Sequence, residues 1–104
     1  MKFGLPDRVI ARLVEVLSQN ESIERTVLFG SRAQGTYHEG SDIDLCLTGA
    51  DINLSVLSSL EARIDDLDMP WKVDLVPEAM IDSKALLDHI HRVGTVLYER
   101  TLTA

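Results

Sequence analysis

The feature that most constrains this chain is the stretch SDIDLCLT, residues 41–48, in which polar and apolar side chains alternate. An alternation with a period of two predicts a β-strand over residues 42–48 with two different faces. One face carries Ile43, Leu45 and Leu47, and the other carries Asp42, Asp44, Cys46 and Thr48. Two like charges on one face of a strand repel each other, so the pair of aspartates calls for a compensating charge.

Two further strands flank this one in the sequence. Residues 26–29 (TVLF) predict a short buried strand that ends at Gly30, before a helical turn at residues 31–34 and a loop at residues 35–40. Residues 71–76 predict a third strand, closed by Pro77, with Asp74 on its polar face. If the second and third strands are neighbours in the sheet, Asp42, Asp44 and Asp74 converge on one patch.

Three segments have apolar residues at helical spacing: residues 6–19, about fifteen residues that end before Pro70, and residues 81–92. The second of these is marked by Leu57, Leu60, Ile64 and Leu67. A last strand is predicted at residues 95–99. This order of elements predicts an α/β (α+β) fold, a small mixed sheet covered by helices, and leaves the strand order open.

Length and composition exclude several classes of protein. The 104 residues predict a single domain, residues 1–104, and the net charge of −7 argues against binding to a nucleic-acid backbone. One cysteine rules out an internal disulfide. Since the N-terminus has no signal-peptide pattern and no stretch approaches the ~20 apolar residues of a membrane span, we expect a cytoplasmic protein with no membrane contact.

The three aspartates suggest a metal site beside a phosphate site. Mg²⁺ prefers oxygen ligands and is commonly held by one or two carboxylates together with substrate phosphates. The backbone after Gly30 and the Ser31 hydroxyl are suited to phosphate oxygens. Taken singly, each element has a simpler explanation: Gly30-Ser31 as a turn, the aspartates of the second strand as a solvated edge, and Asp74 as neutral surface.

Together, the strand, GSRAQG, a short loop, SDIDL, a helix and KVDLV resemble the minimal nucleotidyltransferase domains of the DNA polymerase beta superfamily. The resemblance extends over nearly the whole chain and implies that family's fold. It implies that Gly30 and Ser31 hold the triphosphate, with help from Arg32. We also assign Ser41, the residue before Asp42, to the nucleotide site.

The resemblance also implies the metal ligands. Asp42 and Asp44 would bind two Mg²⁺ ions, and Asp74 would help to hold the metal used by the attacking hydroxyl and accept its proton. Many members of the family have Arg where this chain has Gln34, so the contribution of that position is open.

The implied reaction is transfer of a nucleoside monophosphate, AMP from ATP, to a hydroxyl with release of pyrophosphate. Minimal domains of this kind are typically antitoxins paired with a helical RNase toxin of the HEPN class, and some transfer AMP to a tyrosine of that toxin in a hetero-oligomer. Two alternatives remain: an antitoxin that acts by binding alone, and a subunit that modifies a small molecule of the aminoglycoside type.

Other conspicuous residues are expected to have no chemical role. His89 and His91 stand two positions apart on a helix and therefore diverge, so we expect both at the surface. Cys46 is expected to pack against its neighbours rather than react. His38, Tyr37 and Trp71 are likewise expected to be loop or packing residues.

Overall fold

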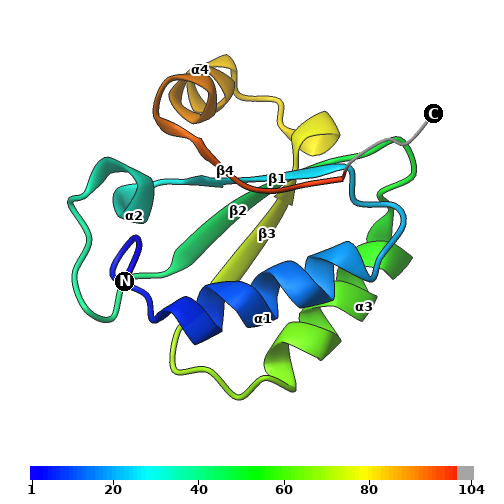
Figure 1. Cartoon of the computed structure of the whole chain (residues 1–104). Helices are drawn as coiled ribbons and strands as arrows, with labels where there is room; N and C mark the ends of the chain where they lie inside the picture. Colours follow the sequence, from blue (N-terminus) through cyan, green and yellow to red (C-terminus); the bar gives the residue numbers. More distant parts are fainter. Residues whose placement is uncertain (101–104) are drawn as a thin grey trace.

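The computed structural model describes residues 1–100 as a four-stranded sheet with helices on both faces (Figure 1). The elements are α1 (Asp7–Ser18), β1 (Arg25–Phe29), α2 (Ser31–Gln34), β2 (Ile43–Thr48), α3 (Leu54–Asp65), β3 (Val73–Pro77), a 3₁₀ turn (Glu78–Met80), α4 (Lys84–Val93) and β4 (Thr95–Glu99). The strand order is β3-β2-β1-β4. Because β1 is antiparallel to both of its neighbours and β2 is parallel to β3, the predicted mixed sheet is confirmed.

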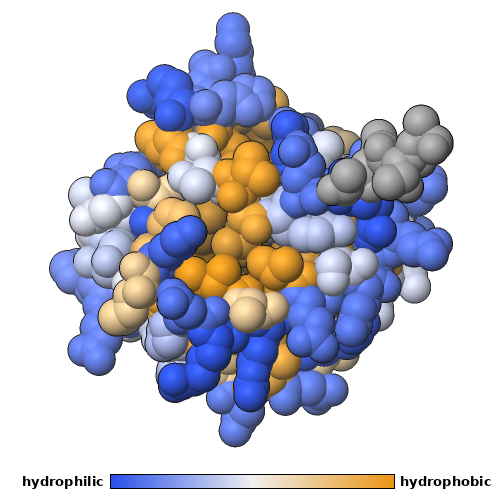
Figure 2. Space-filling model, in the orientation of Figure 1, coloured by the Kyte–Doolittle hydropathy of each residue, from blue (hydrophilic) through white to orange (hydrophobic). Residues whose placement is uncertain are grey.

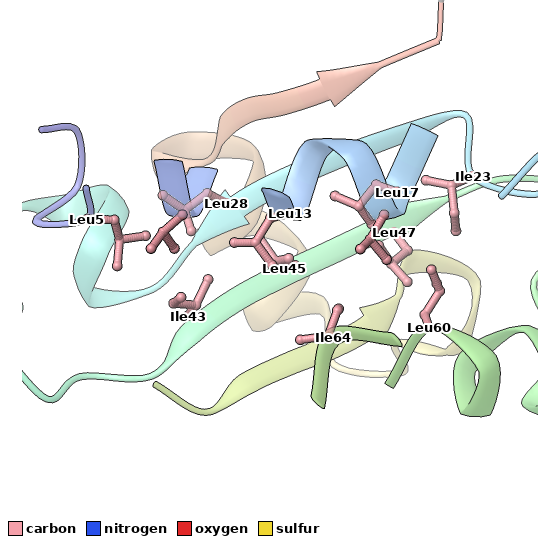
Figure 3. Packing of buried hydrophobic residues seen from close by; sticks show 12 residues of the cluster. Leu5, Leu13, Leu17, Ile23, Leu28, Ile43, Leu45, Leu47, Leu60 and Ile64 are labelled. Carbon is pink, nitrogen blue, oxygen red and sulfur yellow. The ribbon is translucent and has the colours of Figure 1, made fainter. Parts of the chain in front are cut away.

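One face of the sheet carries the main hydrophobic core, under α1 and α3. Leu28 of β1 and the three apolar residues of β2 pack against Leu13, Leu17, Leu60 and Ile64 from the two helices (Figure 3). The alternation predicted for β2 is therefore confirmed, because Ile43, Leu45 and Leu47 all lie in this core. Within residues 1–100, no helix combines the length and the apolar character that crossing a bilayer requires.

The opposite face is covered by α4 and carries a smaller cluster. Phe29, Cys46 and Ile90 are buried there, and Val76 and Leu86 are partly buried against them. With three buried residues against twelve on the other face, the hydrophobic packing on the α4 side is thinner. Figure 2 shows that hydrophobic residues also reach the surface near the middle of the view, between the levels of α4 and α1 in Figure 1, within a border of hydrophilic side chains.

Most element boundaries differ from the predicted ones by one or two residues, and three of the differences have an identifiable cause. Pro77 lies inside β3, which is possible because β3 is an outer strand and the missing N–H need not bond to a neighbour. Helix α3 ends at Asp65, so Leu67 packs on the core from a turn in which Asp68 has a positive φ of 53°. Helix α4 begins only at Lys84, because Ser83 caps it by accepting the N–H of Leu86.

Candidate functional site

Asp44 and Asp74 form the centre of the candidate site. They stand opposite each other in the parallel register of β2 and β3, so the adjacency that the sequence left open is present. Partial burial raises the pKa of Asp44 above its ordinary value, and the charges of Asp74 and Asp42 raise it further. Asp74 also forms an exposed ion pair, in which Lys72 Nζ lies 3.5 Å from Asp74 Oδ1.

Asp42 lies one residue before β2 and is exposed. Its charge acts on Asp44, yet within residues 1–100 no three His, Cys, Asp or Glu side chains lie close enough to hold a metal ion together. The donor set nevertheless fits Mg²⁺, because it consists of carboxylate oxygens whose mutual repulsion a cation would relieve. The binding of metal by all three aspartates stays a prediction.

Gly30 links the carboxylates to the turn that follows β1. Its φ of 75° is a left-handed conformation that side chains disfavour, and a Cβ built on it would overlap Asp44 Oδ2. Only glycine therefore allows the Asp44 carboxylate to lie directly against this backbone. Ser31 begins α2 immediately afterwards, so the predicted phosphate-binding turn and the carboxylates are neighbours.

Arg32 is buried, with 1% of its side chain exposed, and its guanidinium points at backbone carbonyls. Nη1 donates to Phe3 O at 2.8 Å, Nη2 donates to the carbonyls of Glu39 and Ser41, and Nε donates to Ser41 O. These bonds hold the loop between α2 and β2 against the N-terminus. They use the same donors that a phosphate contact would need, and the nucleotide role of Arg32 stays a prediction.

Ser41 is fixed by the same loop. Its Oγ accepts the N–H of His38 at 2.7 Å and its carbonyl accepts from Arg32. The rings of Tyr37 and Trp71 lie 5.2 and 5.8 Å from the Arg32 guanidinium carbon. Trp71 is half-buried, as a packing residue would be, whereas Tyr37 is exposed in the loop. Ser41 thus lies at the entrance to β2, next to Asp42, and its contact with nucleotide stays a prediction.

His89 lies beside the candidate site, so the prediction that it is a surface residue was wrong. It is half-buried on α4, its ring meets Phe29 edge to face, and its Nε2 lies 3.4 Å from Gln34 Nε2. Its charge lowers the pKa of Asp44, opposing the larger upward effects, whereas His91 pairs with Glu78. The sequence could have predicted this position, because His89 follows Leu86 by three residues and therefore lies on the same, partly buried face of the helix.

Cys46 is buried between Phe29 and Ile90, as the packing interpretation predicted. Burial, together with the nearby charge of Glu78, raises the pKa of its thiol to about 11. A thiol with this pKa is protonated at neutral pH, and only the thiolate is nucleophilic. Cys46 is therefore a structural residue beside the site.

The family model of the polymerase beta nucleotidyltransferases matches residues 11–102. The chain belongs to this family. The fold described above is accordingly the polymerase-beta-like nucleotidyltransferase fold, and Gly30, Ser31, Asp42, Asp44 and Asp74 all lie inside the matched region. A search of curated protein sequences gave no significant match.

Several solved structures are similar to this nucleotidyltransferase domain. A toxin–antitoxin structure with AMP-PNP is 28% identical, with a TM-score of 0.68, over 92% of this chain and 75% of that one. A mutant of the toxin–antitoxin complex MntA-HpeT is 26% identical, with a TM-score of 0.70, over 88% and 73%. The Shewanella oneidensis complex of a tri-AMPylated HEPN toxin with its MNT antitoxin is 22% identical, with a TM-score of 0.66, over 89% and 71%, and shows the shared fold.

Proposed function

We propose that this protein is a Mg²⁺-dependent nucleotidyltransferase that transfers AMP from ATP to a hydroxyl of a partner protein and thereby acts as an antitoxin. The observation that carries the proposal is the pairing of Asp44 with Asp74 directly against the Gly30 backbone. Membership of the nucleotidyltransferase family supports the reaction class. The single domain, residues 1–104, would supply the transferring half of the site.

Different residues of the site would bind the triphosphate, hold the metal and accept the proton. Gly30 and Ser31 hold the triphosphate, while Asp42, Asp44 and Asp74 would hold two magnesium ions. Bound magnesium supplies charge neutralisation at the entering and leaving oxygens. Asp74 orients the acceptor hydroxyl and takes its proton as the oxygen bonds to the α-phosphorus. The bond from that phosphorus to the bridging oxygen breaks, and pyrophosphate leaves with the electron pair.

The proposed partner is a helical toxin of the HEPN class, and the proposed acceptor is a tyrosine hydroxyl on it. Toxin–antitoxin structures, one of them with AMP-PNP, are similar to this chain at 26% and 28% identity, which supports a toxin as the partner and a nucleotide as the ligand. The net charge of −7 favours association with a basic protein. The working form would then be a hetero-oligomer.

A second candidate function is neutralisation by binding alone. It is favoured by one observation: within residues 1–100, Asp42 does not complete a group of three side chains that could hold a metal ion. In that case the toxin would be masked by contact, without transfer.

The experiment that separates the two uses the Asp42→Asn/Asp44→Asn double variant, co-expressed with the product of the neighbouring gene. Asn keeps nearly the same volume and removes both charges, so magnesium-dependent ATP binding should be lost while partner binding survives. Asp51→Asn/Asp66→Asn removes the same charge at exposed positions and serves as the control. The readouts are the mass of an AMP adduct on the partner and the partner's RNase activity.

Transfer is the function if wild type and control both add AMP to the partner and inhibit its RNase activity, while the double variant adds no AMP and gives no lasting inhibition. An unmodified partner that all three proteins silence equally well would refute the enzyme and leave the masking antitoxin.

A further inference from the structure

Within residues 1–100, strand β3 is an outer strand of the sheet, and a groove of about 660 Å³ runs along it. The groove reaches from Asp44 and Asp74, next to Leu86 of α4, to Glu61 and Asp65 at the other side, on α3. Figure 1 shows β3 behind β2, with α3 beneath the sheet. Both the candidate site and the free edge of the sheet therefore open into one groove.

The backbone of β3 presents hydrogen-bonding groups to this groove. Ile43 N donates to Lys72 O at 2.8 Å, and the parallel register pairs Asp44 with Asp74. In a parallel ladder alternate residues turn their N–H and C=O to the neighbouring strand, so residues 72, 74 and 76 bond to β2. The backbone N–H and C=O groups of Val73 and Leu75 consequently point away from β2. Such outward groups at the edge of a sheet can bond to an added strand.

The charged lining of the groove is strongly acidic. Five carboxylates, those of Asp44, Glu61, Asp65, Asp68 and Asp74, face one ammonium group, that of Lys72. An occupant with positive side chains is favoured by this charge, and a phosphate backbone is disfavoured. The half-buried Trp71 and Leu75 add apolar contact area between the charges.

From these observations we propose that the partner presents its acceptor hydroxyl on an extended, basic segment that adds to the free edge of β3. The proposal rests on the proposed function, because it names how the acceptor of that same site is held. If the added strand runs antiparallel to β3, the residue opposite Asp74 forms a non-hydrogen-bonded pair with it. The Cβ atoms of the two residues are then about 4.5–5.5 Å apart. Its side chain shares the face of Asp74 and Asp44, so a hydroxyl there meets the proton acceptor.

The first test measures peptide binding to the full chain by fluorescence anisotropy, up to millimolar concentration. The probe is an octapeptide with a central tyrosine flanked by lysines. One control replaces the lysines by glutamates, and a second keeps them but carries N-methyl groups on alternate residues, which block strand pairing. The lysine peptide should bind, and both controls should bind at least about tenfold more weakly. Equal binding of the N-methylated peptide, or no binding of the lysine peptide, would overturn the proposal.

Two matched variants locate the binding site. Asp65→Lys changes the charge inside the groove, and Asp66→Lys makes the same change at the next residue, which faces a different cavity. Reversing one surface charge should weaken the lysine peptide about threefold to tenfold for Asp65→Lys and have little effect for Asp66→Lys. Equal weakening by both variants would show long-range attraction without a groove and overturn the proposal.

ATP binding with Mg²⁺, measured separately by calorimetry, keeps the two proposals apart. If the peptide results hold while ATP fails to bind, the groove stands and the transfer reaction fails. If ATP binds and the peptide results fail, the reaction stands and strand addition is refuted. With both intact, the tyrosine of the lysine peptide should gain the mass of AMP, and an RNA 3′ hydroxyl should not.

Discussion

The two faces of the sheet contrast sharply. Twelve of the described residues form the buried cluster under α1 and α3, whereas the buried cluster on the α4 side has three, Phe29, Cys46 and Ile90. The thinner face also carries Asp44 and Asp74, and partial burial together with the charges of Asp74 and Asp42 raises the pKa of Asp44. One face thus holds most of the buried core, and the other carries the paired carboxylates of the candidate site.

The contrast shows how a chain of this size separates the two tasks. Strand β2 contributes Leu45 to one face and Asp44 to the other, one residue apart. Because Ile43, Leu45 and Leu47 are all buried on the core face, the strand tolerates the electrostatic cost on its opposite face.

Leu45→Ala should have the largest effect. Leu45 is completely buried, so the variant should lower the free energy of unfolding by about 2–5 kcal/mol. Leu86→Ala removes the same atoms from the half-buried wall of the α4 face and should cost about 1 kcal/mol. Urea denaturation of both variants measures the difference, and equal costs would contradict the contrast between the faces.

Arg32→Met should be nearly as damaging. It removes the donors of three backbone carbonyls in a buried position and should cost about 2–4 kcal/mol. The matched control is Arg12→Met, an exposed position on α1, which should be nearly neutral. Measuring the ATP affinity of Arg32→Met beside its thermal stability also tests the predicted nucleotide role of Arg32. If the variant loses ATP affinity but no stability, Arg32 binds nucleotide and does not hold the loop.

Three glycines give a graded series. Gly30→Ala combines a positive φ with overlap on Asp44 and should cost about 2–3 kcal/mol. Gly35→Ala has a φ of 81° but open space around the added methyl, so it should cost about 1 kcal/mol. Gly40→Ala meets neither obstacle and should be neutral or slightly stabilising. Equal losses at Gly30 and Gly35 would show that contact with Asp44 is unimportant.

Asp44→Asn should stabilise the metal-free protein at neutral pH. The folded pKa of Asp44 is raised above its unfolded value, so its contribution to stability is present below the unfolded pKa and is lost as the pH rises through the folded pKa. The variant should therefore melt at the same temperature as wild type near pH 4, which is about the unfolded pKa of an aspartate. At pH 7 it should melt a few degrees higher than wild type. Thermal melts in EDTA test this, with Asp51→Asn as the exposed control. A variant that melts lower at pH 7 would contradict the destabilisation of the Asp44 carboxylate by burial and by the neighbouring charges.

Cys46 should show almost no reaction in the folded protein. With the thiol pKa raised to about 11 and the side chain buried, a disulfide reagent at pH 8 should label it only when the chain unfolds. The labelling rate should rise with urea in step with global unfolding. Rapid labelling in native buffer would show that α4 opens away from the sheet and that this face is looser than its structure indicates.

Several features followed from the sequence because they depend on short-range chemistry. The period of two in residues 42–48 assigned Ile43, Leu45 and Leu47 to a buried face, and the structure confirms it. The strand at residues 95–99 and the turn at residues 31–34 also follow from local pattern and glycine positions. The resemblance to nucleotidyltransferases depended on such local motifs, and the family model confirms it.

Other features were decided by tertiary structure because they depend on which segments meet. The strand order, with β3 beside β2, brings Asp74 opposite Asp44, and no local pattern encodes that pairing. Arg32 follows the phosphate-binding turn in sequence, yet carbonyls from residues 3, 39 and 41 converge on its guanidinium and hold it inside. Helix α4 likewise brings His89 beside Phe29 and Gln34, near the carboxylates, from far along the chain. Pairing across long sequence separations reflects the packing of the whole sheet, so residue spacing identified the candidate groups and only the fold determined which of them meet.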